Sequence, residues 1–255
     1  MISAPSITIS NATLHYHDSE QATLAALNME IPAAAWTCIL GRSGCGKSSL
    51  LRYLANLLNE KVHFSGSLSI SSPLDLQKQV AYMAQQDLLM PWLTVLENVL
   101  LSERFDLNPK KPTSEQQQQV NKAKQLLQQV GLADKASLLP QQLSGGMRQR
   151  VALARTLMQE KPIVLMDEPF SALDAVTRYK LQHLAYELLK HKTVVLITHD
   201  PQEAIRLADR LYILQGTPAF AAPLQLPSTS PPREIDALSA TLQQTIINRL
   251  QADYD

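Results

Sequence analysis

The first sixty residues carry apolar side chains with two different periods. Ile7 and Ile9 lie two positions apart, as in a half-buried strand, and residues 36–40 form a short apolar run that ends at Gly41. Residues 47–58 carry leucines with the period of a helix. We therefore predict a β-rich start, followed by a strand, a glycine-containing loop and a helix. The leucines expected on the buried face of that helix are Leu50, Leu51, Leu54, Leu57 and Leu58.

The middle of the chain, from about residue 91 to residue 159, has the pattern of helices. Thr94 is followed three residues later by Glu97, the spacing at which the two side chains cap a helix start reciprocally. Ser114 and Gln117 repeat that spacing. We predict that a helix begins at each place and that this segment is mainly helical.

Strands and helices alternate again after residue 162, which predicts a mostly parallel, buried sheet. The expected elements are a strand at 163–166, a helix at 174–190, a strand at 194–198, a helix capped by Asp200, and a strand at 211–214. The helical middle is then a subdomain inserted into an α/β fold. Residues 217–233 are rich in proline, serine and threonine, which predicts an irregular connection before a last helix at 235–250.

Composition narrows the class of protein. The 255 residues are 45% hydrophobic, too apolar for a disordered chain, and 23 basic residues balance 23 acidic ones. A neutral chain has no overall basic field, so we expect no nucleic-acid partner, although a local basic face remains possible. No apolar run reaches the roughly 18 residues of a membrane span, and residues 1–8 do not resemble a secretory signal. The two cysteines, Cys38 and Cys45, exclude a disulfide framework and favour a reduced, cytosolic setting.

Five of the eight glycines lie in two short segments, which predicts close backbone approach at both. The first segment, residues 41–48, reads Gly-Arg-Ser-Gly-Cys-Gly-Lys-Ser and matches the phosphate loop Gly-x-x-x-x-Gly-Lys-Ser/Thr. Its glycines let backbone N–H groups surround phosphates at the positive end of the following helix. Lys47 supplies a charge to the β and γ phosphates of a nucleotide, and the Ser48 hydroxyl is expected to bind Mg²⁺.

Asp167 and Glu168 follow the predicted strand at 163–166. Ligands of open α/β sheets bind at the carboxyl ends of the strands. We expect Asp167 to hold Mg²⁺ through its water shell and Glu168 to act as the general base on the attacking water. Two acids after a strand are commonly solvated surface groups, but a phosphate loop in the same chain favours the functional interpretation.

The second glycine segment, residues 143–150, reads Leu-Ser-Gly-Gly-Met-Arg-Gln-Arg. Ser144 is expected to cap a helix that runs to about residue 159, whose first N–H groups can receive an anion. The chain already has one phosphate-binding helix start, so a second one suggests a shared site. Two copies facing head to tail would each complete the other's nucleotide pocket.

In their order and spacing, the phosphate loop, Leu-Ser-Gly-Gly, the apolar strand ending in Asp-Glu and the later Thr-His resemble an ATP-binding cassette (ABC) ATPase over about residues 7–214. The resemblance implies an α/β fold with a P-loop NTPase (RecA-like) core, an N-terminal antiparallel β region and an inserted α-helical subdomain. It implies an ATPase domain at 1–216, with the helical subdomain at about 88–160, and leaves 217–255 as a connection and C-terminal helix. ATP is expected between two cassettes.

The same resemblance assigns roles to individual residues. Tyr16 matches the aromatic residue that stacks on adenine, although His17 is a rival one position away. Gln85 matches the glutamine that reaches Mg²⁺ and the attacking water, Asp174 the loop that crosses to the partner cassette, and His199 the histidine that contacts the γ phosphate. The residues expected to act in catalysis are Lys47, Gln85, Glu168 and His199; those expected to hold Mg²⁺ are Ser48, Gln85 and Asp167; and those expected to bind the nucleotide are Tyr16, Gly41, Ser43, Gly44, Cys45, Gly46, Lys47, Ser48, Ser49, Ser144, Gly145, Gly146 and Asp174.

The implied partners are a second copy of the chain, integral membrane permease subunits and, indirectly, a solute-binding protein, with the chain on the cytoplasmic face of the cell membrane. Residues 87–98 are very apolar for a loop, which indicates core packing for some of them and permease docking for others. This stretch and residues 226–232 resemble importers of the nitrate, sulfonate and taurine group. That group includes importers of the thiamine pyrimidine precursor, which residues 83–93 resemble slightly more.

We therefore predict the ATP-hydrolysing subunit of a bacterial ABC importer. The ATPase of an exporter with a separate permease is the nearest alternative, and only the family resemblance separates the two. A soluble cassette ATPase of DNA repair or of the ribosome usually has two cassettes in one chain, a long coiled-coil insert or a basic extension. This sequence has none of these features, which disfavours that class. A P-loop kinase would leave residues 143–146 and the Asp167–Glu168 pair unexplained.

Cys45 lies inside the phosphate loop, where a helix start and Lys47 both favour a thiolate. We expect alkylation of Cys45 to inactivate the ATPase and bound MgATP to slow it, with Cys38 inert in its core strand. The alternative is that Cys45 is a small buried hydrophobic residue whose thiol never meets solvent.

Overall fold

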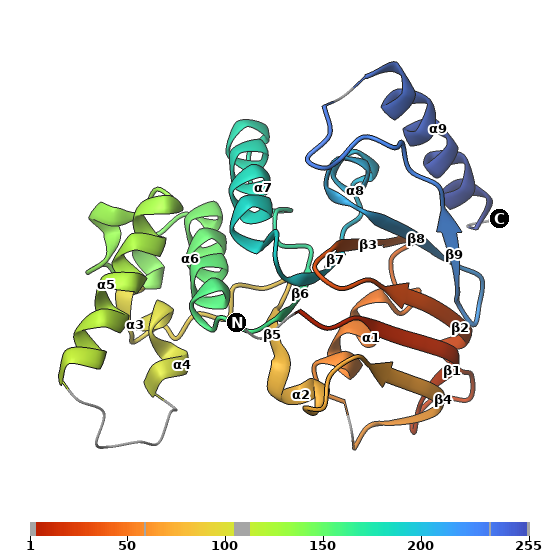
Figure 1. Ribbon diagram of the computed structural model, residues 1–255, viewed down its shortest axis with the longest axis horizontal. Helices are drawn as coiled ribbons and strands as arrows, with labels where there is room; N and C mark the ends of the chain where they lie inside the picture. Colours follow the sequence, from red (N-terminus) through yellow and green to blue (C-terminus); the bar gives the residue numbers. More distant parts are fainter. Residues whose placement is uncertain (1–3, 59, 105–112, 235, 254–255) are drawn as a thin grey trace. The chain divides into compact units, whose positions relative to one another are not determined.

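The computed structural model describes residues 4–58, 60–104, 113–234 and 236–253, and the chain divides into two compact units (Figure 1). The first unit comprises Met1–Val80, Pro162–Glu168 and Tyr186–Asp255, and the second comprises Ala81–Lys161 and Pro169–Ala185. The strands are β1 (Ile7–Tyr16), β2 (Leu24–Ile31), β3 (Trp36–Gly41), β4 (Val62–Ile70), β5 (Val80–Met83), β6 (Ile163–Asp167), β7 (Thr193–Ile197), β8 (Arg210–Gln215) and β9 (Phe220–Leu224). The α-helices are α1 (Lys47–Leu54), α2 (Leu76–Gln79), α3 (Val95–Val99), α4 (Leu101–Arg104), α5 (Thr113–Gln129), α6 (Gly145–Met158), α7 (Ala175–Leu189), α8 (Pro201–Leu207) and α9 (Ala237–Ala252). Two 3₁₀ turns are η1 (Ala133–Lys135) and η2 (Pro140–Gln142).

An antiparallel sheet of order β2-β1-β4 opens the first unit, as the alternating apolar residues predict. Ile7 and Ile9 are buried, whereas their neighbours Thr8 and Ser10 are exposed, so one face of β1 packs inward. Register shifts in both strand pairs interrupt the regular alternation near Ala12.

The core of the first unit is a sheet in which β6, β7, β3, β8 and β9 are neighbours in that order (Figure 1). The pairs β6–β7, β7–β3 and β3–β8 are parallel, and every residue of β3, β6 and β7 is buried. Continuous apolar runs suit strands that are covered on both faces, which confirms the predicted buried parallel sheet. The helix α1 packs on β3, β6 and β7, and α8 packs on β3.

Helices dominate the second unit, as expected for the middle of the chain. In it α6 packs against α3, α4 and α5. The predicted cap of α3 is present, because the Thr94 hydroxyl accepts from the Glu97 N–H at 3.3 Å and the Glu97 carboxylate accepts from the Thr94 N–H at 2.8 Å. Within the described residues no helix combines the length and apolar character needed to cross a membrane.

Three details of the sequence prediction are wrong. The helix α5 already contains Ser114 in its first turn, so Ser114 does not cap it. The helix α1 ends at Leu54, and Leu57 is 55% exposed rather than buried, because the chain turns away after Ala55. Residues 217–233 are not wholly irregular, since they contain β9, which pairs antiparallel with β8 despite Pro223. A proline fits there because β9 is an edge strand.

Candidate functional site

Three neighbouring parallel strands end at the same edge of the core sheet. The phosphate loop follows β3, Glu168 follows β6, and His199 lies two residues after β7. Backbone hydrogen bonds join the carboxyl ends of these strands: the Glu168 N–H donates to Ile197 O at 2.9 Å, and the Thr198 N–H donates to Ile39 O at 3.3 Å. The fold therefore brings the three predicted segments together where α/β proteins bind ligands.

The phosphate loop requires glycine at specific positions. Gly46 is the residue before α1 and has φ of 101°, and a Cβ there would lie 2.7 Å from Thr23 Cγ2. Gly44 has φ of 80° with open space around it. No side chain caps α1, so the N–H groups of its first turn are not bound by an Ncap side chain and point where phosphates can accept from them.

The Lys47 side chain is buried and folded back on the loop. Its Nζ donates to Gly41 O and to Arg42 O, both at 2.7 Å. The loop backbone thus fixes an ammonium charge at the start of α1, next to the uncapped N–H groups. Two positive features, a helix start and a lysine, converge on one small region.

Cys45 is buried in the same loop, 6% exposed, and a Cβ added to Gly41 would lie 2.8 Å from the Cys45 Sγ. Burial raises the pKa of the Cys45 thiol, and Lys47 offsets the rise only partly. The prediction of a favoured thiolate is therefore wrong in direction, because the missing water outweighs the nearby positive charge. Cys38 is fully buried in β3, and burial raises its pKa as well.

Asp167, the last residue of β6, is a buried carboxyl group. Neither of its oxygens makes a hydrogen bond of normal geometry within the described residues. Burial raises the pKa of Asp167, while the adjacent Ser48 hydroxyl lowers it. Unsatisfied buried oxygens beside a hydroxyl are a donor set that suits a hard divalent cation such as Mg²⁺.

Glu168 and His199 form a pair. His199 Nδ1 lies 3.0 Å from Glu168 Oε2, and the histidine side chain is 63% exposed while the glutamate side chain is 18% exposed. Glu168 has φ of 49°, a left-handed conformation that is uncommon outside glycine. The Glu168 carboxylate, at the end of β6, thus lies beside His199, two residues after β7.

Tyr16 ends β1, and its hydroxyl donates to Ser49 Oγ at 2.9 Å on the first turn of α1. The ring therefore lies next to the phosphate loop. His17 is exposed, and its backbone N–H donates to Lys61 O at 3.1 Å. The side chain that contacts α1 is therefore that of Tyr16 and not that of His17.

In the second unit, Ser144 begins α6 as predicted, and its hydroxyl accepts from the Met147 N–H at 3.3 Å. Gly145 is exposed at the first turn. A Cβ on Gly146 would lie 3.2 Å from Leu173 Cδ2, so Gly146 packs against the segment that leads to Asp174. Asp174 caps the next helix, because its carboxylate accepts from the Thr177 N–H at 3.0 Å, which lowers its pKa.

Gln85 follows β5 and is exposed in the second unit. Sequence reasoning missed how this segment is held. Asp87, two residues later, accepts from Arg148 Nε at 2.9 Å, and Arg155 donates to the carbonyls of Asp87 and Leu88 at 2.7 and 2.8 Å. Two arginines of α6 thus tie the Gln85 segment to the helix that Ser144 begins. The partners are more than sixty residues apart, so a single sequence gives no signal for the pairing.

Comparison with known proteins decides the family. Residues 24–171 match the profile of the ABC transporter family. The chain is 41% identical over 228 residues to an uncharacterized ABC transporter ATP-binding protein of Haemophilus influenzae, an alignment that covers 88% of this chain and 90% of the relative. The chain belongs to the ABC transporter family.

A second relative and a solved structure agree with this assignment. The aliphatic sulfonates import ATP-binding protein SsuB 1 of Xanthomonas axonopodis is 39% identical over 225 residues, which cover 87% of this chain and 86% of the relative. The dimeric ATP-binding cassette MJ0796, solved with ADP and Pi, superposes with a TM-score of 0.72 at 30% identity, covering 88% of this chain and 100% of that one. The chain is thus an ABC ATPase with a P-loop NTPase fold, and its nucleotide is ATP.

Proposed function

We propose that the chain is the ATP-hydrolysing subunit of an ABC importer, working as a head-to-tail dimer on a separate permease. The observation that carries the proposal is the convergence of the phosphate loop, Asp167, Glu168 and His199 at one edge of the core sheet. Each of these groups has the chemistry that one step of ATP hydrolysis needs.

In the proposed site, the ATP phosphates are bound by the phosphate loop. The N–H groups of the first turn of α1 donate to the phosphate oxygens, and Lys47 supplies its charge to the β and γ phosphates. Tyr16, held beside α1 by its hydrogen bond to Ser49, is positioned to stack its ring on the adenine. Cys45 and Gly41 contribute through backbone shape, because the Cys45 side chain faces inward.

Ser48 and Asp167 would hold Mg²⁺, because the buried Asp167 oxygens lack normal hydrogen bonds and the Ser48 hydroxyl lies next to them. When bound, the ion neutralises charge on the transferred phosphoryl group. Gln85 belongs to the second unit, and its role toward the ion and the attacking water is a prediction from the family pattern.

Glu168 is the proposed general base. Its carboxylate accepts a proton from the attacking water, whose oxygen forms a bond to the γ phosphorus as the bond to the leaving ADP oxygen breaks. His199, 3.0 Å from the same carboxylate, holds Glu168 in position and can also donate a hydrogen bond to the γ phosphate. Removal of the Glu168 base is expected to lower turnover by about 100-fold or more while MgATP still binds.

The other half of the proposed nucleotide site comes from a second copy. Ser144, Gly145 and Gly146 begin an exposed helix start that fits the phosphates of the opposite chain, and Asp174 lies on the loop packed against Gly146. The head-to-tail arrangement is favoured because a chain with one phosphate loop, in its first unit, has a second helix start suited to anions, in its second unit.

The proposed permease contact includes Leu88 and Trp92, which are 53% and 72% exposed in the apolar stretch 87–98. Their neighbours Val95, Asn98 and Val99 are buried, so core packing accounts for only part of the stretch. We place the chain on the cytoplasmic face of the membrane, where a solute-binding protein would serve the same permease from the other side. A small sulfonate is the solute favoured by the SsuB relative, and taurine, nitrate or a thiamine pyrimidine precursor are the other candidates from the sequence pattern.

Uptake measurements in cells that lack this chain test the proposal. Labelled sulfonate, taurine, nitrate and pyrimidine precursor are supplied in turn, and the strain is complemented with the wild type or with Glu168→Gln. We expect the wild type, and not the variant, to restore uptake of one solute class. Faster efflux with wild-type complementation would show an exporter, and unchanged transport of every solute would contradict the importer assignment.

A further inference from the structure

The last helix of the chain ends beside the phosphate loop. Asp253, the residue after α9, lies with its Oδ2 3.3 Å from Arg42 Nε, and its Oδ1 accepts from the Gly216 N–H at 2.5 Å. The Asp253 side chain is 8% exposed and that of Arg42 is 28% exposed. This ion pair, the Asp253–Arg42 pair, is therefore more sheltered from water than an ordinary surface salt bridge.

Arg42 is the second residue of the phosphate loop, so the pair acts on the loop itself. The Arg42 carbonyl is one of the two that accept from Lys47 Nζ, and the Arg42 guanidinium also donates to Thr217 Oγ1. Asp253 contributes to the raised pKa of the Cys45 thiol, which places its negative charge against the loop. A continuous set of contacts therefore leads from the end of α9 through Arg42 to Lys47.

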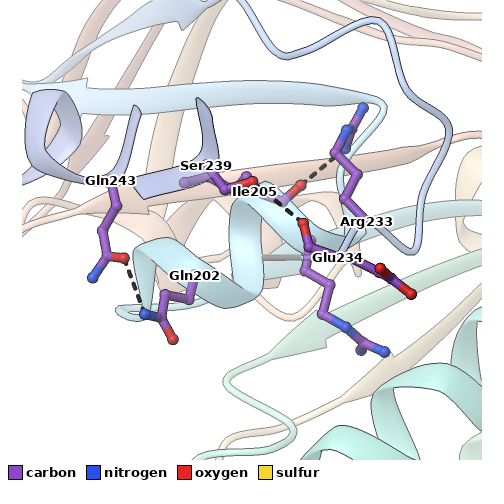
Figure 2. A pocket seen from close by; sticks show the side chains of 7 residues that line it. Gln202, Ile205, Arg233, Glu234, Ser239 and Gln243 are labelled. Atoms are coloured by element: carbon purple, nitrogen blue, oxygen red, sulfur yellow. Dashed lines mark hydrogen bonds between the residues drawn. The ribbon is translucent and has the colours of Figure 1, made fainter. Parts of the chain in front are cut away.

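Further contacts hold α9 in place along its length. Arg233, buried before the helix, donates to Ile205 O at 2.9 Å (Figure 2) and to Ala208 O at 2.6 Å, and so binds carbonyls at the end of α8. Gln202 Nε2 donates to Gln243 Oε1 at 3.0 Å between α8 and α9 (Figure 2). The helix α8 begins two residues after His199, so α9 is braced against the element that follows the proposed catalytic histidine.

We propose that Asp253 is a positioning residue for nucleotide binding, which holds Arg42 and through it the phosphate-loop backbone and Lys47. The C-terminal helix is then part of the support of the nucleotide site and not an independent tail. The inference rests on the proposed ATP site in the phosphate loop.

If Asp253 acted only through its charge, its removal would change nucleotide affinity in the opposite direction from the loss of a positioning residue. A measurement of affinity therefore tests the inference. Removing a carboxylate near the loop makes the site more positive, so simple electrostatics predicts tighter binding of the anionic nucleotide by Asp253→Asn. Loss of positioning predicts weaker binding, because Arg42 and the carbonyl that holds Lys47 are less restrained. The sign of the change therefore separates the two effects.

Nucleotide affinity is measured by titration calorimetry with MgATP and MgADP, and steady-state hydrolysis gives KM and kcat. For Asp253→Asn we expect both affinities to weaken roughly threefold to tenfold and KM to rise alike, with kcat at saturating ATP within about twofold of the wild type. Asp253→Glu keeps the charge and is expected to restore most of the affinity. Asp75→Asn is the matched control, because its carboxylate pairs with Lys78 at the same 3.3 Å but is 74% exposed.

A double-mutant cycle completes the test. In an Arg42→Gln background, Asp253→Asn is expected to weaken binding no further, since the partner through which it acts is gone. Unchanged or tighter binding by Asp253→Asn, or equal effects of Asp253→Asn with and without Arg42, would overturn the inference. Failure of the wild type to bind either nucleotide would instead contradict the proposed ATP site.

Discussion

Two helices of this chain begin at glycine-containing segments, and they begin in different ways. The helix α1 starts after Gly46, which has φ of 101° and no side chain to cap the helix, and its first residue is the buried Lys47. The helix α6 starts after Ser144, which has an extended backbone and caps its own helix at 3.3 Å. The first start combines a cradle of N–H groups with a fixed charge, whereas the second is exposed and already weakly capped, and the Arg148 in its first turn is paired with Asp87 at 2.9 Å.

This difference separates two kinds of anion site. The α1 start can hold phosphates within one chain, because the loop, the lysine and the helix all belong to the first unit. The α6 start has no lysine in its Leu-Ser-Gly-Gly segment, and its first-turn Arg148 is paired with Asp87, so it is suited to adding contacts to a nucleotide already bound elsewhere. The proposed composite site of two copies rests on this difference between the two helix starts.

The largest effect is expected when the positive charge of Lys47 is removed from the start of α1. Lys47→Ala is expected to weaken ATP binding by about 100-fold and to lower hydrolysis with it, because a charged hydrogen-bond donor to the phosphates is lost. Binding is measured by calorimetry and turnover by phosphate release. Lys61→Ala, which removes an exposed lysine of the same unit, is the control and should change neither. Unchanged affinity in Lys47→Ala would rule out the phosphate-loop assignment.

A second comparison uses the same substitution at the two helix starts. Gly46→Ala puts a Cβ on a residue with φ of 101° and 2.7 Å from Thr23 Cγ2, so we expect about 2 kcal/mol of destabilisation. Gly145→Ala meets nothing nearer than Arg148 Nη2 at 3.9 Å and should be neutral or slightly stabilising. Urea unfolding of both variants measures the contrast. Equal losses at the two positions would mean that α1 does not depend on the conformation of Gly46.

Asp167→Asn is expected to have a smaller, stabilising effect whose size depends on pH. Burial raises the folded-state pKa of Asp167 above its unfolded value, so the charged carboxylate lowers the free energy of unfolding at neutral pH. The variant should unfold about 2–4 °C higher than the wild type at pH 7 without Mg²⁺ and nucleotide, since removing the desolvated negative charge contributes about 1 kcal/mol.

The gain should shrink as the pH falls below the raised folded-state pKa and disappear below the unfolded-state pKa, where Asp167 of the wild type is neutral in both states. Thermal unfolding followed at several pH values tests this sign. Asp75→Asn, at an exposed carboxylate, serves as the reference. A wild type that is the more stable protein at pH 7 would show that Asp167 is not an unsatisfied carboxylate.

The elements that carry the proposed site were largely predictable from local patterns. Strands β3, β6 and β7 are continuous apolar runs, and the caps at Thr94 and Asp200 follow from single residues and their spacing. A phosphate loop after one such strand and Asp-Glu after another are sufficient to place both at one sheet edge, because parallel strands share their carboxyl end.

What the sequence did not predict depends on water or on distant partners. The thiol of Cys45 was expected to ionise easily, yet its burial against Gly41 outweighs the nearby charges. The Asp253–Arg42 pair joins residues more than two hundred positions apart, and no pattern in the local sequence predicts such a contact. The strand β9 was missed because Pro223 and its neighbours indicate a loop, whereas pairing with β8 decides the conformation.

The head-to-tail use of the two helix starts is tested most directly by size-exclusion chromatography with MgATP. Glu168→Gln should elute as a dimer, because it binds ATP without hydrolysing it. The double variant Glu168→Gln with Ser144→Arg should bind ATP equally well and elute as a monomer, since the arginine side chain blocks the helix start that meets the opposite nucleotide. An ATP-dependent dimer of the double variant, equal to that of Glu168→Gln, would contradict a nucleotide site completed by Ser144 of a second copy.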